Sequence, residues 1–474
     1  MATNRKSLAL TLPILLGCLL PLAAAQDVPD TQVVEMTLSE SNSSDLGFLP
    51  RRRLAPLLAP RETLESEPKY KSRGRIYYGV VYGDSTDNVF TLVIDESGGP
   101  GKGFDTLYVD ANNDNRIDPE KERFSFRMSQ KDSAVDEEPL RVTIEVSSGG
   151  RKYPYRVAFR ASPDSNAQNP AKTIRAQLFD PSYCEGEAFF GGKSRKIAIA
   201  DLNGNGLFSD VPAENLMYGD RFFADLDGDG GFRSDIGVES QPGYPYGGYT
   251  KIAGRWYTVV ADPDGRQIRI SAASPALGLV QAGPSIASVH LVSKTQQCQL
   301  DFSNGLAEAV AGTYQLEAID LKATSDSGKV WRTGAFVAGD TRPEVVVREN
   351  ETVELSGGGP PLRIEPTISR GADAGELKIG LAIFGTAGEE YYWYESNPSV
   401  VKPSVEICDE SRPLLPSVSF KFGRGEPQTH VWRVPGNLTG VLRITPKLDT
   451  GPFESELVSR EIEVKDGRWV EEPK

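Results

Sequence analysis

The sequence predicts a mostly β, multidomain protein built from antiparallel sheets. Short runs rich in β-branched and aromatic residues recur along the chain, and Gly, Asp and Ser separate them. Helical periodicity is scarce. The 47 glycines and 33 prolines among 474 residues favour many turns, and the length alone suggests about three domains.

Strand-like runs begin soon after residue 73 and continue to the end of the chain. In the first half they start at Ile76, Val89, Thr106, Arg141, Lys196, Arg221, Trp256 and Gln267. Pro263-Asp264-Gly265 supplies a hairpin turn between the last two. After about residue 284, runs separated by turn signals are typical of immunoglobulin-like sandwich modules. The predicted units are a signal peptide (1–25), a disordered or linker segment (26–72), a β domain with one calcium loop (73–165), a β domain with two calcium loops (166–283), and two sandwich-like modules (284–366 and 367–474).

The first 25 residues have the composition of an export signal. Arg5 and Lys6 precede an apolar stretch from 8 to 22, and Ala23-Ala24-Ala25 provides a small-residue cleavage site. We therefore expect a periplasmic, cell-surface or extracellular protein, with no transmembrane segment in the mature chain. A lipoprotein anchored through Cys18 is the alternative, which the apolar run beyond Cys18 disfavours.

The net charge limits the class of partner, and the cysteine content limits the possible disulfides. The formal net charge is −14, and removal of the signal with its two basic residues makes it −16, which argues against nucleic acid as a partner. An acidic surface suits divalent cations. Cys184, Cys298 and Cys408 remain in the mature chain, so one disulfide is possible in an exported protein, but the sequence does not choose the pair.

Three segments repeat one pattern of oxygen-bearing residues, and each follows a predicted strand. Asp or Asn occupies positions 1, 3 and 5, Gly or Asn occupies position 6, and an apolar residue occupies position 8. Ca²⁺ takes about six to eight oxygens, including a backbone carbonyl at position 7, and the chain needs a residue tolerant of positive φ at position 6. The candidate ligands are Asp110, Asn112, Asp114, Arg116 and Asp118 in the first loop, Asp201, Asn203, Asn205, Leu207 and Asp210 in the second, and Asp225, Asp227, Asp229, Gly231 and Asp235 in the third.

The loops match an EF-hand only over their first nine residues. No helix pattern follows them, and position 12 is Lys121, Pro212 or Ile236 instead of a bidentate Glu. We therefore expect weak structural sites with dissociation constants of about 10⁻⁴–10⁻³ M. Ligand charge ranks the third loop first and the second loop last, and the alternative for each loop is an Asx-rich turn that binds no metal.

Three stretches, Leu107–Asp114, Ala200–Gly206 and Gly219–Gly230, resemble segments of uncharacterised secreted proteins of planctomycete-type bacteria with EF-hand-like calcium loops in a β-rich context. The resemblance covers the middle of the chain and implies export and calcium loops, but no established activity. Strand-borne loops with a ninth-position acid such as Asp118 are also similar to those of integrin-type propellers. The uneven spacing of the three loops disfavours a propeller, which needs regular repeats.

Catalytic motifs do not emerge from the sequence. His290 and His430 both lie in strand patterns, and the chain lacks a nucleophile elbow, a zinc-protease motif and a phosphate-binding loop. The aromatic run 389–394 either stacks on sugar rings or packs across strands.

We therefore predict an exported calcium-binding protein without catalytic activity, whose bound Ca²⁺ rigidifies strand-borne loops for a structural, scaffolding or adhesive role. The alternative is a secreted polysaccharide-binding or polysaccharide-cleaving protein that uses calcium structurally. A third hypothesis is an adhesin whose loops bridge to carboxylates of a partner. The protein or glycan partner, the substrate and the oligomeric state stay open.

Overall fold

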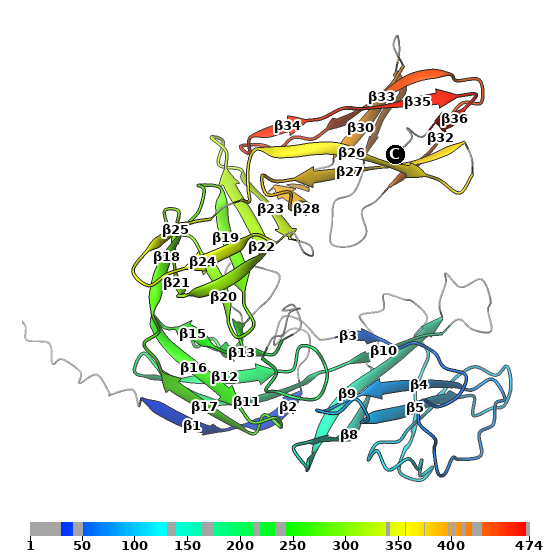
Figure 1. Ribbon diagram of the computed structural model, residues 1–474. Coiled ribbons are helices and arrows are strands. Elements are labelled where there is room, and N and C mark those ends of the chain that lie inside the picture. Colours follow the sequence, from blue (N-terminus) through cyan, green and yellow to red (C-terminus); the bar gives the residue numbers. More distant parts are fainter. Residues whose placement is uncertain are drawn as a thin grey trace, which may run out of the picture.

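The computed structural model describes residues 30–40, 51–129, 139–163, 174–211, 219–232, 243–337, 342–355, 357–373, 375–396, 399–400, 403–409, 413–419 and 429–470 (Figure 1). All regular secondary structure in these ranges is β-strand, which confirms the mostly β prediction. The predicted signal peptide, Cys18 and Asp235 lie outside them. Within the described part of the chain, no helix is long and apolar enough to cross a membrane.

Four antiparallel sheets enclose the hydrophobic core of the first half, which extends from Met36 to Ile270. The first sheet has the order β4 (Ile76–Val81), β5 (Val89–Asp95), β6 (Thr106–Val109), β7 (Arg123–Ser125). The second has the order β3 (Arg51–Arg53), β10 (Ile174–Phe179), β9 (Arg151–Pro163), β8 (Leu140–Ser148). The third has the order β14 (Tyr244–Pro245), β13 (Arg221–Ala224), β12 (Lys193–Ala200), β11 (Ser182–Phe190), β2 (Thr37–Glu40). The fourth has the order β1 (Thr31–Glu35), β17 (Gln267–Ala272), β16 (Arg255–Ala261), β15 (Tyr249–Ile252).

The second half has its own core, which extends from Val280 to Val464. Its largest sheet has eleven strands. Eight of them lie in the order β20 (Gln297–Asp301), β19 (Ile286–Val292), β22 (Gly312–Thr324), β23 (Val330–Phe336), β28 (Glu390–Ser396), β27 (Glu376–Phe384), β26 (Leu362–Arg370), β34 (Ser455–Leu457). The other three each pair with one of these strands: β24 (Glu344–Val347) with β22, β29 (Ser399–Val400) with β28, and β32 (His430–Arg433) with β27. A second sheet has the order β21 (Leu306–Val310), β18 (Leu277–Gln281), β25 (Thr352–Glu354). A third has the order β31 (Pro413–Ser419), β30 (Ser404–Cys408), β33 (Gly440–Lys447), β35 (Arg460–Lys465), β36 (Arg468–Val470).

Two of the predicted boundaries fall inside continuous sheets. The boundary at 366/367 lies within β26, and β23 pairs with β28 across it, so the two expected sandwich modules share one sheet and one core. The boundary at 165/166 separates β9 from β10, which are hydrogen-bonded neighbours. The boundary at 283/284 lies close to the change from the first core to the second. Turn signals mark chain reversals, but they do not reveal which strands pair across them.

The described residues of the segment expected to be a linker, 26–72, contribute three strands. β1 pairs with β17, β2 with β11, and β3 with β10, so each adds to an edge supplied by residues more than 100 positions away in the chain. These strands are three to five residues long, too short for a clear period-2 pattern. Their pairing was not readable from local sequence.

Arg52 lies in the segment expected to be disordered or a linker, but its side chain takes part in the packing of the first half. From β3 its guanidinium lies over the Tyr82 ring, with the Arg52 Cζ atom 4.3 Å from the ring centroid. Its Nε atom lies 3.6 Å from Asp180 Oδ2, and the Asp180 side chain is fully buried. The arginine therefore neutralises an acid inside the first half of the protein.

The cysteines, His290 and the aromatic run were also singled out in the sequence. Cys184, Cys298 and Cys408 are free, so the possible disulfide is not formed. His290 Nδ1 lies 3.0 Å from Glu317 Oε2 in a buried contact. Tyr391 is buried and its hydroxyl donates to Glu389 Oε1 over 3.0 Å, which fits the packing interpretation for this residue of the aromatic run.

Replacing Arg52 should destabilise the first half of the protein. Arg52→Ala leaves Asp180 buried without its cation, and we expect the free energy of unfolding to fall by about 2–4 kcal/mol. Arg53→Ala, on the same strand but at an exposed position, is the matched control, with an expected change below about 1 kcal/mol. Urea unfolding followed by fluorescence measures both, and equal losses would contradict the role given to Arg52.

Candidate metal centres

All three loops leave the end of a strand and fold around the carboxylate at position 1. The first loop follows β6, the second follows β12 and the third follows β13. The three position-1 residues, Asp110, Asp201 and Asp225, are buried. In each, Oδ2 accepts the backbone N–H of position 6, from Asn115 at 3.0 Å, Gly206 at 2.6 Å and Gly230 at 3.0 Å.

Positions 3 and 5 repeat a second set of hydrogen bonds. The position-3 Oδ1 atom accepts the N–H of position 5 over 3.1, 2.9 and 3.3 Å in the three loops. The position-5 Oδ1 atom accepts the N–H of position 7 over 2.9, 2.8 and 2.7 Å. Position 6 has positive φ in every loop, 62° at Asn115, 86° at Gly206 and 87° at Gly230. The three loops thus share one backbone conformation, which is the one that the residue types at position 6 predict.

The third loop brings three carboxylates together at the surface. Asp225, Asp227 and Asp229 each offer an oxygen within 4.8 Å of the other two, and among the described residues this is the one group of three acidic, His or Cys side chains that does so. Asp227 and Asp229 are exposed. Burial of Asp225 would raise its pKa, but N–H groups of Gly228 and other loop residues lower the pKa below its ordinary value. Three of the four acids that ranked this loop first therefore lie together, and the fourth, Asp235, lies outside the described residues.

The candidate ligands of the first loop differ in their surroundings. Burial, with the charges of Glu122 and Asp114 nearby, raises the pKa of Asp110 to about 6. The Asp118 carboxylate accepts the N–H of Glu120 over 2.9 Å and lies 3.4 Å from Lys121 Nζ, so it serves its own turn. The Arg116 side chain reaches out to Glu65.

Glu122 is a residue of the first loop that the sequence interpretation missed. It is buried, and it stands immediately before β7. Its Oε1 atom accepts the N–H of Ala111 over 2.9 Å, and its Oε2 atom accepts the N–H of Asp118 over 2.7 Å. One carboxylate therefore joins positions 2 and 9 and closes the loop.

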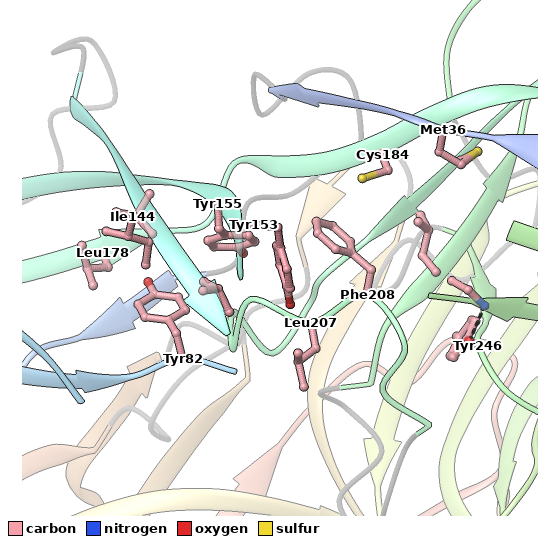
Figure 2. Close-up of a cluster of buried hydrophobic side chains, with 14 of the residues drawn as sticks. Met36, Tyr82, Ile144, Tyr153, Tyr155, Leu178, Cys184, Leu207, Phe208 and Tyr246 are labelled. Carbon is pink, nitrogen blue, oxygen red and sulfur yellow. Dashed lines mark hydrogen bonds between the residues drawn. The ribbon is translucent and has the colours of Figure 1, made fainter. Parts of the chain in front are cut away.

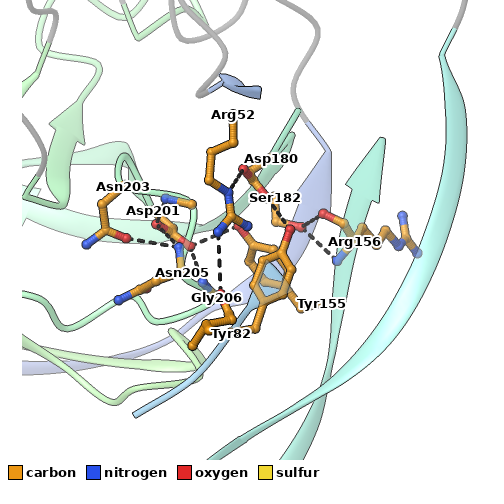
Figure 3. Close-up of polar contacts among 12 residues, drawn as sticks. Arg52, Tyr82, Tyr155, Arg156, Asp180, Ser182, Asp201, Asn203, Asn205 and Gly206 are labelled. Atoms are coloured by element: carbon orange, nitrogen blue, oxygen red, sulfur yellow. Dashed lines mark hydrogen bonds and ion pairs between the residues drawn. The ribbon is translucent and has the colours of Figure 1, made fainter. Parts of the chain in front are cut away.

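The second loop is the most deeply buried of the three. Figure 3 shows its polar residues Asp201, Asn203, Asn205 and Gly206 together with Arg52, Asp180 and Tyr155. Asp201 is 0 % exposed, its Oδ1 accepts the N–H of Gly204 over 2.6 Å, and its Oδ2 accepts the hydroxyl of Tyr155 over 2.9 Å. Burial, with the charge of Asp180 nearby, raises the pKa of Asp201 to about 7. The amides of Asn203 and Asn205 both donate to Asp210 Oδ2, over 2.7 and 2.5 Å.

Asp220 was also missed, and it corresponds to Glu122. It stands immediately before β13, it is fully buried, and its Oδ2 atom accepts the N–H of Asp210 over 2.7 Å. Burial, with the charges of Asp201 and Asp210, raises its pKa well above the ordinary value. An acid directly before the strand that follows a loop was the sequence signal that could have identified both residues.

Several elements converge on the second loop (Figure 2). Leu207 and Phe208 enter the first core, and Tyr153 donates its hydroxyl to the Gly206 carbonyl over 2.9 Å. The Asn205 carbonyl accepts the N–H of Gly83 over 2.6 Å, and the Phe208 N–H donates to Pro263 in the predicted hairpin turn over 2.9 Å. The loop with the lowest ligand charge is therefore the one most connected to the rest of the fold.

The metal-free protein should lose stability as the pH rises. Asp110 and Asp201 have folded-state pKa values raised to about 6 and about 7, so the folded state holds more protons than the unfolded state above pH 4. The contribution of these groups is fully present below about pH 4 and is lost as the pH rises through 6 and 7. Urea midpoints measured with chelator should fall between pH 5 and pH 8, and an Asp201→Asn variant should show a smaller fall. A midpoint that rises over this range would contradict the prediction.

Comparison with protein families, with curated proteins and with solved structures finds no match to this chain.

Proposed function

We propose that this is an exported calcium-binding protein with a structural, scaffolding or adhesive role, in which Ca²⁺ rigidifies the three strand-borne loops. The observation that carries the proposal is the carboxylate group Asp225, Asp227 and Asp229. Three like charges so close repel one another, and a divalent cation removes that cost by taking oxygens as its ligands.

The shared conformation of the loops supports extending the proposal to the first and second. In each loop the hydrogen bonds hold the oxygens of positions 1, 3 and 5 around one turn. A site organised in advance binds with a smaller entropic cost. The residues present fit a hard cation, because the donor set consists of carboxylate and amide oxygens.

A structural role fits the places that the loops occupy. Each loop connects the end of one strand to the next element of its sheet, and the second contacts elements of several sheets. With dissociation constants of about 10⁻⁴–10⁻³ M, the sites would be occupied outside the cell. Export, as the sequence of residues 1–25 predicts, would place the protein there.

The second half would supply the surface for scaffolding or adhesion. We propose that its sheets pack as immunoglobulin-like sandwiches, with the continuous core from Val280 to Val464 between them. This arrangement gives a rigid body on which loops can present a binding surface for a protein or glycan partner.

Calcium should stabilise the first half measurably. For a site with a dissociation constant of about 10⁻⁴–10⁻³ M, 10 mM free Ca²⁺ adds about 1.4–2.7 kcal/mol to the free energy of unfolding. We expect Tm to rise by several degrees relative to protein in chelator, as measured by calorimetry of the full chain. Mg²⁺ at the same concentration should have a smaller effect, because it requires near-octahedral geometry and dehydrates reluctantly.

The contribution of the third loop can be separated with exposed substitutions. In the presence of chelator, an Asp227→Asn, Asp229→Asn double variant should be at least as stable as the parent, the wild-type protein, since charge repulsion is reduced. Its gain in Tm on adding calcium should be smaller than that of the parent. Identical melting of the parent with and without chelator would refute the proposed function.

A further inference from the structure

We propose that the outer face of the sheet formed by β3, β10, β9 and β8 binds a linear polysaccharide that carries carboxylate or sulfate groups (Figure 1). This surface of the first half would serve the adhesive role proposed above, and the inference rests on that function for a location outside the cell. Binding at this face requires no calcium. A failure here and a failure of the calcium proposal are therefore distinguishable.

Strand alternation separates the two faces of this sheet. Its inner face enters the first core through Leu178 of β10, Phe159 of β9 and Val142 of β8. Successive side chains of a strand point to opposite faces, so the residues between these form the outer face. Among the described residues of the four strands, Glu145 is the one acid there, and its Oε2 atom lies 3.7 Å from Lys152 Nζ. The basic residues of the outer face are Arg53 on β3, Arg175 on β10, Lys152, Arg156 and Arg160 on β9, and Arg141 on β8.

The strand register gathers the arginines in a small area. Arg53 and Arg160 stand on either side of Gln177, and Arg141 is opposite Ala158. Neighbouring strands lie about 4.8 Å apart and each residue adds about 3.3 Å along a strand, so the Cα atoms of the five arginines fall within about 20 Å of one another. The whole chain has a formal net charge of −14. A polyanion would therefore be attracted to this face and repelled by most of the remaining surface.

Neighbouring side chains hold several of these guanidinium groups in place. The Glu40 carboxylate of β2 accepts from Nη1 of both Arg141 and Arg156, so these two arginines lie side by side at the surface. The Arg160 Cζ atom lies 5.2 Å from the centroid of the Phe179 ring. Long side chains that are already ordered lose less entropy when they bind a ligand.

A pocket of about 340 Å³ borders the face at Arg160. Two of its walls are the rings of Phe126 and Phe159, which meet edge to face with their centroids 5.3 Å apart. Arg127, after β7, supplies a second cation. Apolar walls with a few charged groups are typical of small-ligand sites. The pocket is thus suited to one acidic sugar ring of a chain whose other anionic groups lie along the arginines of the face.

The side chains of the face favour a polysaccharide over a membrane or a peptide. Arginine presents a planar fork that matches the paired oxygens of an anionic group. A membrane-binding surface adds apolar side chains that insert into lipid. Among the described residues, none of the well-exposed large hydrophobic side chains lies on these four strands. Peptides that extend a sheet bind at its edge, whereas these charges stand on its face.

Biolayer interferometry with the full chain in chelator tests the proposal. Dextran sulfate and polygalacturonate present the two anionic groups, and neutral dextran is the control ligand. An Arg53→Gln, Arg156→Gln variant, changed at two exposed positions, should bind both anionic polymers about 10-fold more weakly than the wild-type protein. The matched control, Arg363→Gln, Arg443→Gln, removes the same charge from exposed arginines of the second half. It should change the affinity less than about 2-fold.

The outcomes separate the partner class from the calcium function. Equal losses in the two variants, or wild-type protein that binds neither anionic polymer, overturn the inference and leave the calcium proposal standing. Equal binding of neutral dextran overturns the role given to charge. Tighter binding to phosphatidylserine vesicles or to poly-glutamate than to either anionic polysaccharide overturns the choice of a glycan.

Arginine modification of the wild-type protein tests the surface without any variant. With saturating dextran sulfate, phenylglyoxal should modify Arg53, Arg141 and Arg156 several-fold more slowly than without it, as peptide mass spectrometry measures. Arg363 and Arg443 should react at unchanged rates. Protection spread equally over both sets overturns the assignment of the face.

Discussion

The buried carboxylate of Asp201 is the constraint on which the first half of the protein depends. It lies at the end of β12 with no exposed surface, so every lone pair must be met from within the protein. The N–H groups of Gly204 and Gly206 meet it from the loop, and the hydroxyl of Tyr155 meets it from β9. Satisfying one acid thus fixes the loop conformation and joins two sheets.

A second buried acid near Asp201, Asp180, also has its partners within the protein. Tyr82 donates its hydroxyl to Asp180 over 3.0 Å, and Arg52 supplies the positive charge at the same carboxylate. The strand that carries Arg52 is only three residues long, so this ion pair gives β3 a specific place at the edge of its sheet. In contrast, the third loop keeps two of its acids in water, where their repulsion is screened.

Strand β13 connects the candidate centres with the second half of the protein. Asp220 precedes this strand and Asp225 follows it, so four residues separate an acid of the second loop from the first acid of the third. Arg221 is fully buried, burial lowers its pKa to about 10, and the charge of Glu317 in β22 opposes that shift. Nearby, the Gln296 side chain accepts the N–H of Tyr249 over 2.6 Å and donates to its carbonyl over 2.8 Å. The candidate metal centres therefore border the contact between the two cores.

The sequence by itself determined the features that depend on near neighbours. The β-branched runs became strands, and the spacing of Asp and Asn predicted three loops of one conformation, with Asn115 adopting the same positive φ as the glycines. These features follow from backbone dihedral preferences and from hydrogen bonds that span a few residues.

Only the tertiary structure decided which distant strands pair and which acids are buried. It gave β1, β2 and β3 their partners, placed one sheet across residue 366, and brought Glu122 and Asp220 back to loops that begin 12 and 19 residues earlier. The register of β12 with β13 put Asp220 opposite Asp201. Spacing along the chain cannot encode this, because pairing depends on which sheet edges meet and which side chains the common core can cover.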